Sequence, residues 1–196
     1  TNWNATEKTH VYSVGGTYTI ECTGTLRGFQ FALAGDRLKI IEIFNWGGSN
    51  LDLGGPTFSF SGCSNLTVSA TNSPANTGNI IGCFYLVGSS SFTGGIAGWD
   101  MSNTQSCLYM CYNASSFNED ISGWDVSNIT DFGAAFSGTA MSVANYDALL
   151  IAWSAQTVQS GVTFGISAQY TGGGTAAAAR ATLVTKGWTI VDGGSV

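Results

Sequence analysis

The chain has 196 residues, of which only 9% are charged, and a net charge of −6. Nothing in this composition would neutralise phosphate groups, so it argues against binding to nucleic acid and against adsorption on anionic membranes. Low charge and 27 glycines are typical of an extracellular protein rich in tight turns, and no apolar run approaches the length of a membrane span.

The N-terminal part is predicted to form strands. β-prone runs at 11–13, 18–22 and 27–31 are separated by glycines. We expect residues 1–34 to form an N-terminal β cap, because the first layer of a stacked array otherwise exposes apolar surface and an open edge. The run 10–20 resembles the end of polycystic-kidney-disease-type (PKD) β-sandwich domains, although the W-G-D-G strand that normally lies upstream is missing.

Alternating apolar and polar residues continue the predicted strands after position 35. The clearest run is 35–46, and further short strands are expected at 51–53, 58–60 and 63–70. The 35–46 run resembles the entry into the repeat arrays of BspA-type bacterial surface proteins. The phrase F-S-G-C-S-N-L, which contains Cys63, is a common junction in that family, and the resemblance implies that Cys63 points inward.

One phrase of the sequence occurs twice. Residues 90–103, SSFTGGIAGWDMSN, return as residues 115–128, SSFNEDISGWDVSN, displaced by 25 positions. A fixed period between about twenty and fifty residues indicates stacked repeats that bury each other's apolar faces. We therefore expect Trp99 and Trp124 to stack, with their indole N–H groups bonded to carbonyls of the neighbouring layer.

The same displacement predicts further equivalences between the two copies. It pairs Tyr85 with Met110 and Phe84 with Tyr109. Asp100 and Asp125 each precede a Ser-Asn pair, so they are interpreted as turn residues that accept hydrogen bonds from local backbone N–H groups.

The second copy extends into a longer family pattern. Residues 117–136, FNEDISGWDVSNITDFGAAF, resemble the repeat of BspA-type proteins, which is also described in mycoplasma lipoproteins. We therefore predict a mainly β fold with a C-terminal α/β cap. Its centre would be a right-handed leucine-rich-repeat-like solenoid over residues 35–138, with one parallel strand per coil of about 25 residues.

The sequence changes character after position 138. Apolar residues at i, i+3, i+4 and i+7 from Tyr146 to Trp153 predict an amphipathic helix, with Ser142 or Asn145 as its N-cap.

A second helix is predicted at 175–186, with Thr175 as N-cap and Gly187 as the stop, followed by a strand at 188–191. This arrangement resembles the C-terminal cap of BspA-type proteins, so residues 139–196 are predicted to form that cap.

The cysteines are odd in number and cannot all pair within the chain. No C-x-x-C spacing occurs and the chain has one His, so a zinc site is not expected. We interpret them chiefly as buried thiols; one internal disulfide, or an intermolecular bond from the odd cysteine, is the alternative. They are Cys22, Cys63, Cys83, Cys107 and Cys111.

Motifs for catalysis, cofactors or metals are not found, and none of these sites is predicted. The one compact acidic patch, 118–120, is a solvated loop by default, and adjacent residues do not supply the two facing carboxylates, about 5–10 Å apart, of a glycosidase. The candidates for a ligand-binding surface are Trp46, Tyr85, Tyr112, Asn118, Glu119 and Asp120.

The expected function is that of a non-enzymatic extracellular surface or adhesion module, which binds a host or neighbouring-cell protein or glycan through its repeat face. The resemblance implies a place on a bacterial surface or a phage virion. The alternative is a structural subunit that self-assembles into an extracellular filament or virion appendage, and a remote alternative is a glycan-active enzyme. Neither a cofactor, a nucleic-acid partner nor direct membrane insertion is expected.

Overall fold

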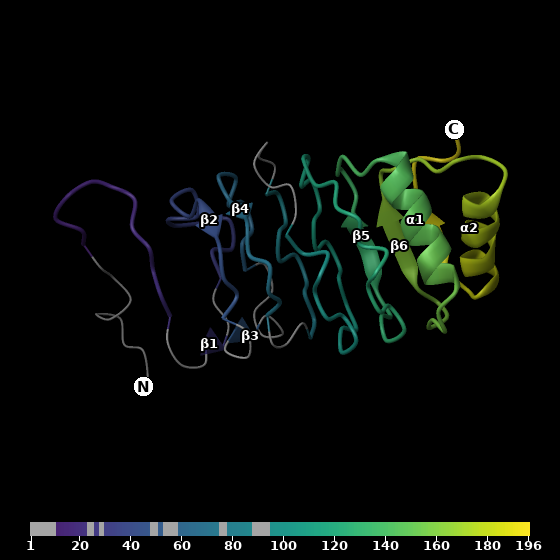
Figure 1. Ribbon diagram of the computed structural model, residues 1–196, viewed down its shortest axis with the longest axis horizontal. Coiled ribbons are helices and arrows are strands. Elements are labelled where there is room, and N and C mark those ends of the chain that lie inside the picture. The colour runs from purple at the N-terminus through teal and green to yellow at the C-terminus, as the bar shows by residue number, and fades with distance from the viewer. Residues whose placement is uncertain are drawn as a thin grey trace.

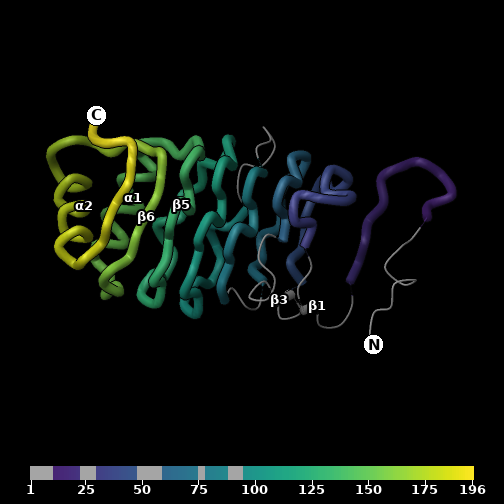
Figure 2. Tube along the Cα trace, turned by 180° about the vertical axis from the view of Figure 1, so that it is seen from behind, coloured from purple at the N-terminus to yellow at the C-terminus, as the bar shows by residue number. Residues whose placement is uncertain are grey.

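A computed structural model shows that the protein is elongated (Figure 1). Successive stretches of the chain lie side by side along the long axis, and the two helices lie at the C-terminal end (Figure 1). The view from behind shows the same order (Figure 2). The structure describes residues 11–22, 26–27, 30–47, 51–52, 59–74, 78–87 and 95–196.

Regular secondary structure is short except at the C-terminal end. Every paired strand is parallel, in sheets ordered β1–β3, β2–β4 and β5–β6–β7. The described elements are β1 (Leu26–Arg27), β2 (Glu42–Ile43), β3 (Leu51–Asp52), β4 (Thr67–Val68), β5 (Phe132–Phe136), α1 (Val143–Ser154), β6 (Thr163–Ile166), α2 (Thr175–Thr185) and β7 (Thr189–Val191).

Backbone hydrogen bonds join three segments between β4 and α1: 80–87, 106–114 and 131–139. Every second N–H in a segment donates to a carbonyl of the next segment, as from Gly82 to Leu108 (2.9 Å). Several of the N–H groups between them donate three residues back within their own segment, as from Tyr85 to Gly82 (3.1 Å). The first two segments are therefore largely turns that are also bonded to the next segment, whereas 131–139 contains β5.

The predicted fold class is wrong. Four of the seven strands are two residues long, and the described residues show neither a closed coil nor one sheet running through the repeats. The reason is local: Leu86, Tyr109 and Ala134 have φ of 56°, 55° and 49°, which places them in the left-handed region of type II-like turns. Backbone groups used in turns cannot extend a mainly β solenoid.

The N-terminal strands predicted at 11–13 and 18–22 are also wrong. Residues 11–22 contain no strand, and every one of them is exposed. The prediction at 27–31 is met only at position 27, in β1; residues 30 and 31 form no strand, and positions 28 and 29 lie outside the described residues. Position 58 of the 58–60 run lies outside them too, and its remainder is a turn. Position 10 of the PKD-like run lies outside the described residues. The three predicted domains, 1–34, 35–138 and 139–196, stay predictions.

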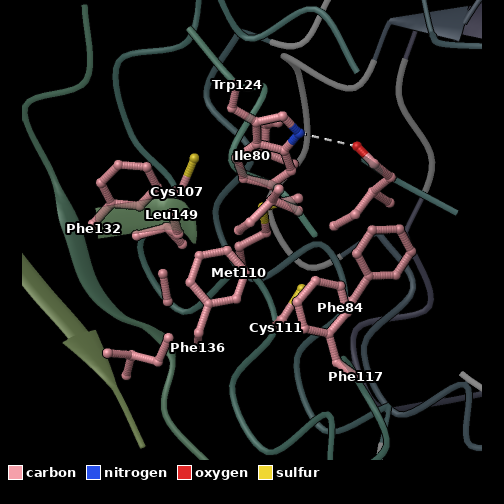
Figure 3. Packing of buried hydrophobic residues seen from close by; sticks show 14 of the residues in the cluster. Ile80, Phe84, Cys107, Met110, Cys111, Phe117, Trp124, Phe132, Phe136 and Leu149 are labelled. Atoms are coloured by element: carbon pink, nitrogen blue, oxygen red, sulfur yellow. Dashed lines mark hydrogen bonds between the residues drawn. The ribbon is translucent and has the colours of Figure 1, made fainter. Parts of the chain in front are cut away.

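A continuous apolar core runs from Trp46 to Trp188. Figure 3 shows side chains from successive segments, such as Phe84, Cys111 and Phe136, packed together. The ring pairs continue into the helices, since Phe132 stacks on Trp153 with centroids 5.2 Å apart. This packing buries the same side of each segment and holds the layers together.

The predicted stacking of Trp99 on Trp124 is wrong, and the expected indole hydrogen bond is found for Trp124 but not for Trp99. Trp124 donates its indole N–H to the Ile96 carbonyl one layer back (3.1 Å), as expected (Figure 3). Trp99 instead packs edge-on against Trp46, with centroids 5.2 Å apart, and its indole nitrogen is buried without a hydrogen-bond partner among the described residues. Asp100 and Asp125 accept from the N–H groups two residues on, as predicted.

The C-terminal helices follow the sequence closely. Ser142 caps α1 by accepting from the Asn145 N–H (3.3 Å), and α2 ends just before Gly187, whose φ is 96°. The N-cap of α2 is Gly174, so the prediction of Thr175 was wrong.

The C-terminal sheet contains a strand that the sequence patterns missed. It is β6, the central strand between β5 and β7. A Cβ at Gly165 would lie 2.6 Å from the Ala134 Cα, so only glycine allows β6 to approach the preceding layer this closely.

Asp192 ties α1, α2 and the end of β7 together. Its carboxylate accepts from the Tyr146 hydroxyl (2.8 Å) and from Arg180 Nε (2.7 Å). The Arg180 guanidinium also lies over the Tyr170 ring, 5.2 Å from its centroid. Burial alone would raise the pKa of Asp192, but the hydrogen bonds from Arg180 and Tyr146 outweigh burial and hold this pKa below its usual value.

Replacing Asp192 with Asn should lower the free energy of unfolding by roughly 1–3 kcal/mol at neutral pH, because the buried Tyr146 hydroxyl and the half-buried Arg180 guanidinium lose a charged acceptor. The folded pKa lies below the unfolded value of about 3.9, so this contribution is complete above that value and is lost as the pH falls through the folded pKa. Urea unfolding at a series of pH values measures it.

The exposed pair of Asp36 and Lys39 (2.9 Å) supplies the control for that experiment. Asp36→Asn should change the unfolding free energy by less than about 0.5 kcal/mol, because an exposed ion pair contributes little. Equal losses in the two variants would contradict the assignment of Asp192 as the tie.

Four of the five cysteines belong to the core, and none forms a disulfide. Burial raises the pKa of the Cys63 thiol to about 12, against the opposing charge of Arg37. Burial also raises the pKa of Cys83, Cys107 and Cys111. Cys22 is exposed. The interpretation as buried thiols is confirmed for these four.

A thiol-specific reagent should therefore modify one cysteine of the folded chain, Cys22, and all five after unfolding in denaturant. Mass spectrometry of the labelled peptides identifies the modified positions. Rapid labelling of a core cysteine in the folded chain would show that the layers open more readily than this packing indicates.

Candidate functional site

Three tyrosines gather on the surface of the turn segments. Tyr85 and Tyr112 stack in parallel, with ring centroids 5.3 Å apart and planes 11° apart. Tyr109 lies edge-on to both, at 6.2 Å from Tyr85 and 5.6 Å from Tyr112. We call these three residues the tyrosine cluster. Tyr109 is 39% exposed, and the other two are half-buried.

The turn segments position these rings. The Leu86 N–H donates to the Tyr112 carbonyl (2.8 Å), which sets Tyr85 beside Tyr112 in the next segment. Phe84 and Cys111, the residues just before them, are buried in the core. Each segment passes from buried residues to half-buried ones at this place, and the bonds between segments bring two tyrosines of adjacent layers into contact.

The repeat displacement of 25 residues gave the wrong pairs here. The backbone bonds run from the Phe84 N–H to the Met110 carbonyl and from the Leu86 N–H to the Tyr112 carbonyl, a displacement of 26 residues, and the ring stack joins Tyr85 to Tyr112, 27 residues on. The predicted pairs with Met110 and Tyr109 are wrong, because spacing between layers is not constant. The structure thus brings together two candidate residues that sequence analysis had named separately.

The two segments that carry the cluster are uncharged. Neither 78–87 nor 106–114 contains a charged residue. Ile81 and Leu108 are half-buried, and the following segment is small at this place. A Cβ at Gly133 would lie 2.8 Å from the Leu108 side chain. The cluster is thus an aromatic surface with aliphatic neighbours rather than an isolated exposed ring.

The acidic triplet, residues 118–120, is not part of this cluster. Each of its side chains accepts hydrogen bonds from backbone N–H groups. Asn118 accepts from the Ser142 N–H (2.8 Å) at the start of α1. Glu119 accepts from three consecutive backbone N–H groups, those of 95–97. Asp120 accepts from the Ser122 N–H (3.0 Å). These contacts give the triplet a part in holding neighbouring loops.

Trp46 cannot contact a ligand from the surface, because it is buried. Its ring packs edge-on against Phe60, with centroids 5.9 Å apart, and its backbone N–H donates to Asn72 (3.1 Å). Of the six candidates, Tyr85 and Tyr112 are the pair that the structure joins on one surface.

Metal sites and membrane helices were sought in the described part of the chain. No group of three or more His, Cys, Asp or Glu side chains there could hold a metal ion. No helix there is long and apolar enough to cross a membrane.

Comparison with known proteins identifies the family. Residues 59–162, more than half of the chain, match the family described as "Mycoplasma protein of unknown function, DUF285". The chain belongs to this family. No curated protein and no solved structure matches it significantly.

The DUF285 match covers the tyrosine cluster, the second repeat copy and α1. The match confirms, at the level of the family, the predicted resemblance to a repeat found in mycoplasma proteins. The BspA-type assignment and the PKD-like cap are not tested by it and stay predictions.

Sequence analysis missed Tyr109, the most exposed ring of the cluster. The signal was present, because Tyr109 and Tyr112 are three residues apart and Tyr85 lies in the preceding layer. What could not be read from the sequence is the positive φ of Tyr109, which sets the direction in which its side chain leaves the backbone.

The Glu119 contacts make a testable prediction for this DUF285 chain. Glu119→Ala should make the amides of 95–97 exchange their hydrogens faster, since three N–H groups lose their acceptor at a local cost of roughly 1–3 kcal/mol. Hydrogen exchange followed by mass spectrometry measures it. Asp120→Ala is the control, and it should leave 95–97 unchanged because Asp120 holds Ser122.

Proposed function

We propose that this chain is a non-enzymatic extracellular surface or adhesion module that binds a protein or a glycan through the tyrosine cluster. The observation that carries the proposal is the contact of Tyr85, Tyr109 and Tyr112 on two segments that contain no charged residue. Tyrosine combines a large apolar ring with a hydroxyl group, and it is enriched at the centres of binding interfaces.

Rigidity supports this use of the surface. Each ring of the cluster contacts the other two, and the backbone beneath them is bonded to adjacent segments on both sides. Side chains held in place lose little conformational entropy when a partner binds, so more of the contact energy appears as affinity. The absence of charges within 78–87 and 106–114 lowers the cost of removing water from this surface.

Location at a cell surface is part of the proposal. The resemblance of 117–136 to BspA-type surface proteins supports it, as do membership of DUF285 and the low content of charged residues. The engagement of Glu119 and Asp120 by backbone N–H groups supports a non-enzymatic role, because these carboxylates act as acceptors within the fold.

The test is a binding screen with variants matched in exposure. The wild-type chain is applied to a glycan array and to a panel of extracellular-matrix and cell-surface proteins, and each hit is repeated with Tyr109→Ala and with Tyr85→Ala/Tyr112→Ala. We expect Tyr109→Ala to weaken binding by about tenfold or more, as truncation of a central aromatic contact does.

Val184→Ser is the control variant, because Val184 is exposed on α2, away from the cluster. It should bind as the wild type does. A ligand whose affinity is unchanged by all tyrosine variants, or reduced equally by Val184→Ser, would overturn the tyrosine cluster as the binding surface.

A further inference from the structure

A pocket of about 160 Å³ lies between two layers of the chain, 70–73 and 95–99. The Ser73 hydroxyl bridges these layers by donating to the Gly98 carbonyl (2.7 Å), and the Glu119 side chain lines the pocket from the following layer. A cavity of about 150 Å³ holds one six-membered ring, so one ring-sized ligand fits. We call it the Trp99 pocket, and the lining residues that bear on its chemistry are Thr71, Asn72, Ser73, Gly98, Trp99 and Glu119.

Trp99 brings to this pocket a hydrogen-bond donor that the chain itself does not use. Its indole nitrogen is buried and has no partner among the described residues. The indole N–H of Trp124, one repeat on, donates to the Ile96 carbonyl instead. Trp46 and Trp153 also have unpaired indole nitrogens, but neither lines the pocket. A buried donor without an acceptor costs free energy, and an acceptor atom of a ligand beside Trp99 would remove that cost.

The other polar groups of the pocket include both donors and acceptors. Asn72 donates one amide hydrogen to Asn45 (3.0 Å), which leaves the second for a ligand. Glu119 accepts from the three N–H groups of 95–97, and a carboxylate has about four acceptor positions, so one remains. Thr71 is exposed, and its hydroxyl both donates and accepts.

Charge and hydrogen bonding together select the class of ligand. Glu119 is the one charged residue among the described residues that line the pocket, and 47–179 contains no Lys or Arg. An anionic ligand would therefore meet a carboxylate with no cation to balance it. An ammonium group offers only donors and would leave the Trp99 indole N–H unpaired. A hydroxyl group is both donor and acceptor, so a neutral ligand with several hydroxyl groups satisfies both kinds of partner.

We propose that the Trp99 pocket binds one neutral sugar residue. An oxygen of the sugar accepts from the Trp99 indole N–H, its hydroxyl groups donate to Glu119, and Thr71 and Asn72 bond the remaining oxygens. The site goes beyond the proposed function and does not depend on it, because no residue of the tyrosine cluster is among the described residues that line the pocket.

The test is a titration followed by proton–nitrogen correlation NMR in buffer free of glycerol. The probes are glucose, galactose, mannose and N-acetylglucosamine, with glucuronate as the charged comparison. At least one neutral sugar should shift the Trp99 indole N–H resonance, which is identified by its absence from Trp99→Phe, together with the amides of 95–98. The dissociation constant should be on the order of 1 mM, as for a small ligand with few contacts. Glucuronate should not bind, because Glu119 repels it.

Two glycine variants locate the site. A Cβ added at Gly98 or at Gly123 would have no heavy atom within 4 Å, and neither glycine has a positive φ, so both positions accept a side chain. Gly98→Leu places a side chain at the wall of the pocket and should weaken sugar binding by about tenfold or more. Gly123→Leu, the matched change before Trp124, should leave binding within about twofold.

A third variant removes a polar group and keeps the shape of the pocket. Thr71→Val replaces the hydroxyl with a methyl group and should weaken binding by roughly threefold or more, because one hydrogen bond to the sugar is lost. Circular dichroism and thermal unfolding confirm that all three variants are folded. Because Thr71 is exposed, this variant still tests the site if Gly98→Leu does not fold.

Four results would overturn the proposal: none of the four neutral sugars binds at about tenfold the expected dissociation constant, the Trp99 indole resonance does not move, glucuronate binds as well as the neutral sugars, or Gly98→Leu and Gly123→Leu weaken binding equally. Tyr109→Ala should leave the titration unchanged. A chain that binds a partner at the tyrosine cluster but no sugar in the Trp99 pocket would reject this site and leave the proposed function standing.

Discussion

The structure depends on how backbone N–H groups are divided between neighbours in space and neighbours in sequence. In 80–87 and 106–114, alternate N–H groups bond the next layer, and the others close turns within their own segment. Every other feature of the repeat region follows from this division. It fixes the distance between layers, buries one side of each segment, and presents the other side to solvent.

The turns within each segment also require positive φ at certain residues. A turn at 107–110 places Tyr109 at a positive φ, and one at 111–114 does the same for Asn113. Such conformations cost energy in residues other than glycine, so they persist only where packing and hydrogen bonds on both sides compensate. The rings of the tyrosine cluster are therefore rigid because the strained backbone beneath them is held between two layers.

The two ends of the molecule differ in how the outermost layer of the chain is covered. At the C-terminal end, Asp192 joins Tyr146 and Arg180, and the helices cover the last layer. At the N-terminal end, no strand among the described residues pairs with the second edge of β2, and several apolar side chains of 11–44 are exposed.

The sequence by itself determined the two C-terminal helices, the buried thiols and the turn roles of Asp100 and Asp125. These depend on local spacing, capping and hydrophobicity, which a single chain displays directly. Only the tertiary structure decided the conformation within each layer, the strand β6 and the meeting of Tyr85 with Tyr112. These depend on backbone bonds between residues far apart in the sequence, whose register no local pattern fixes.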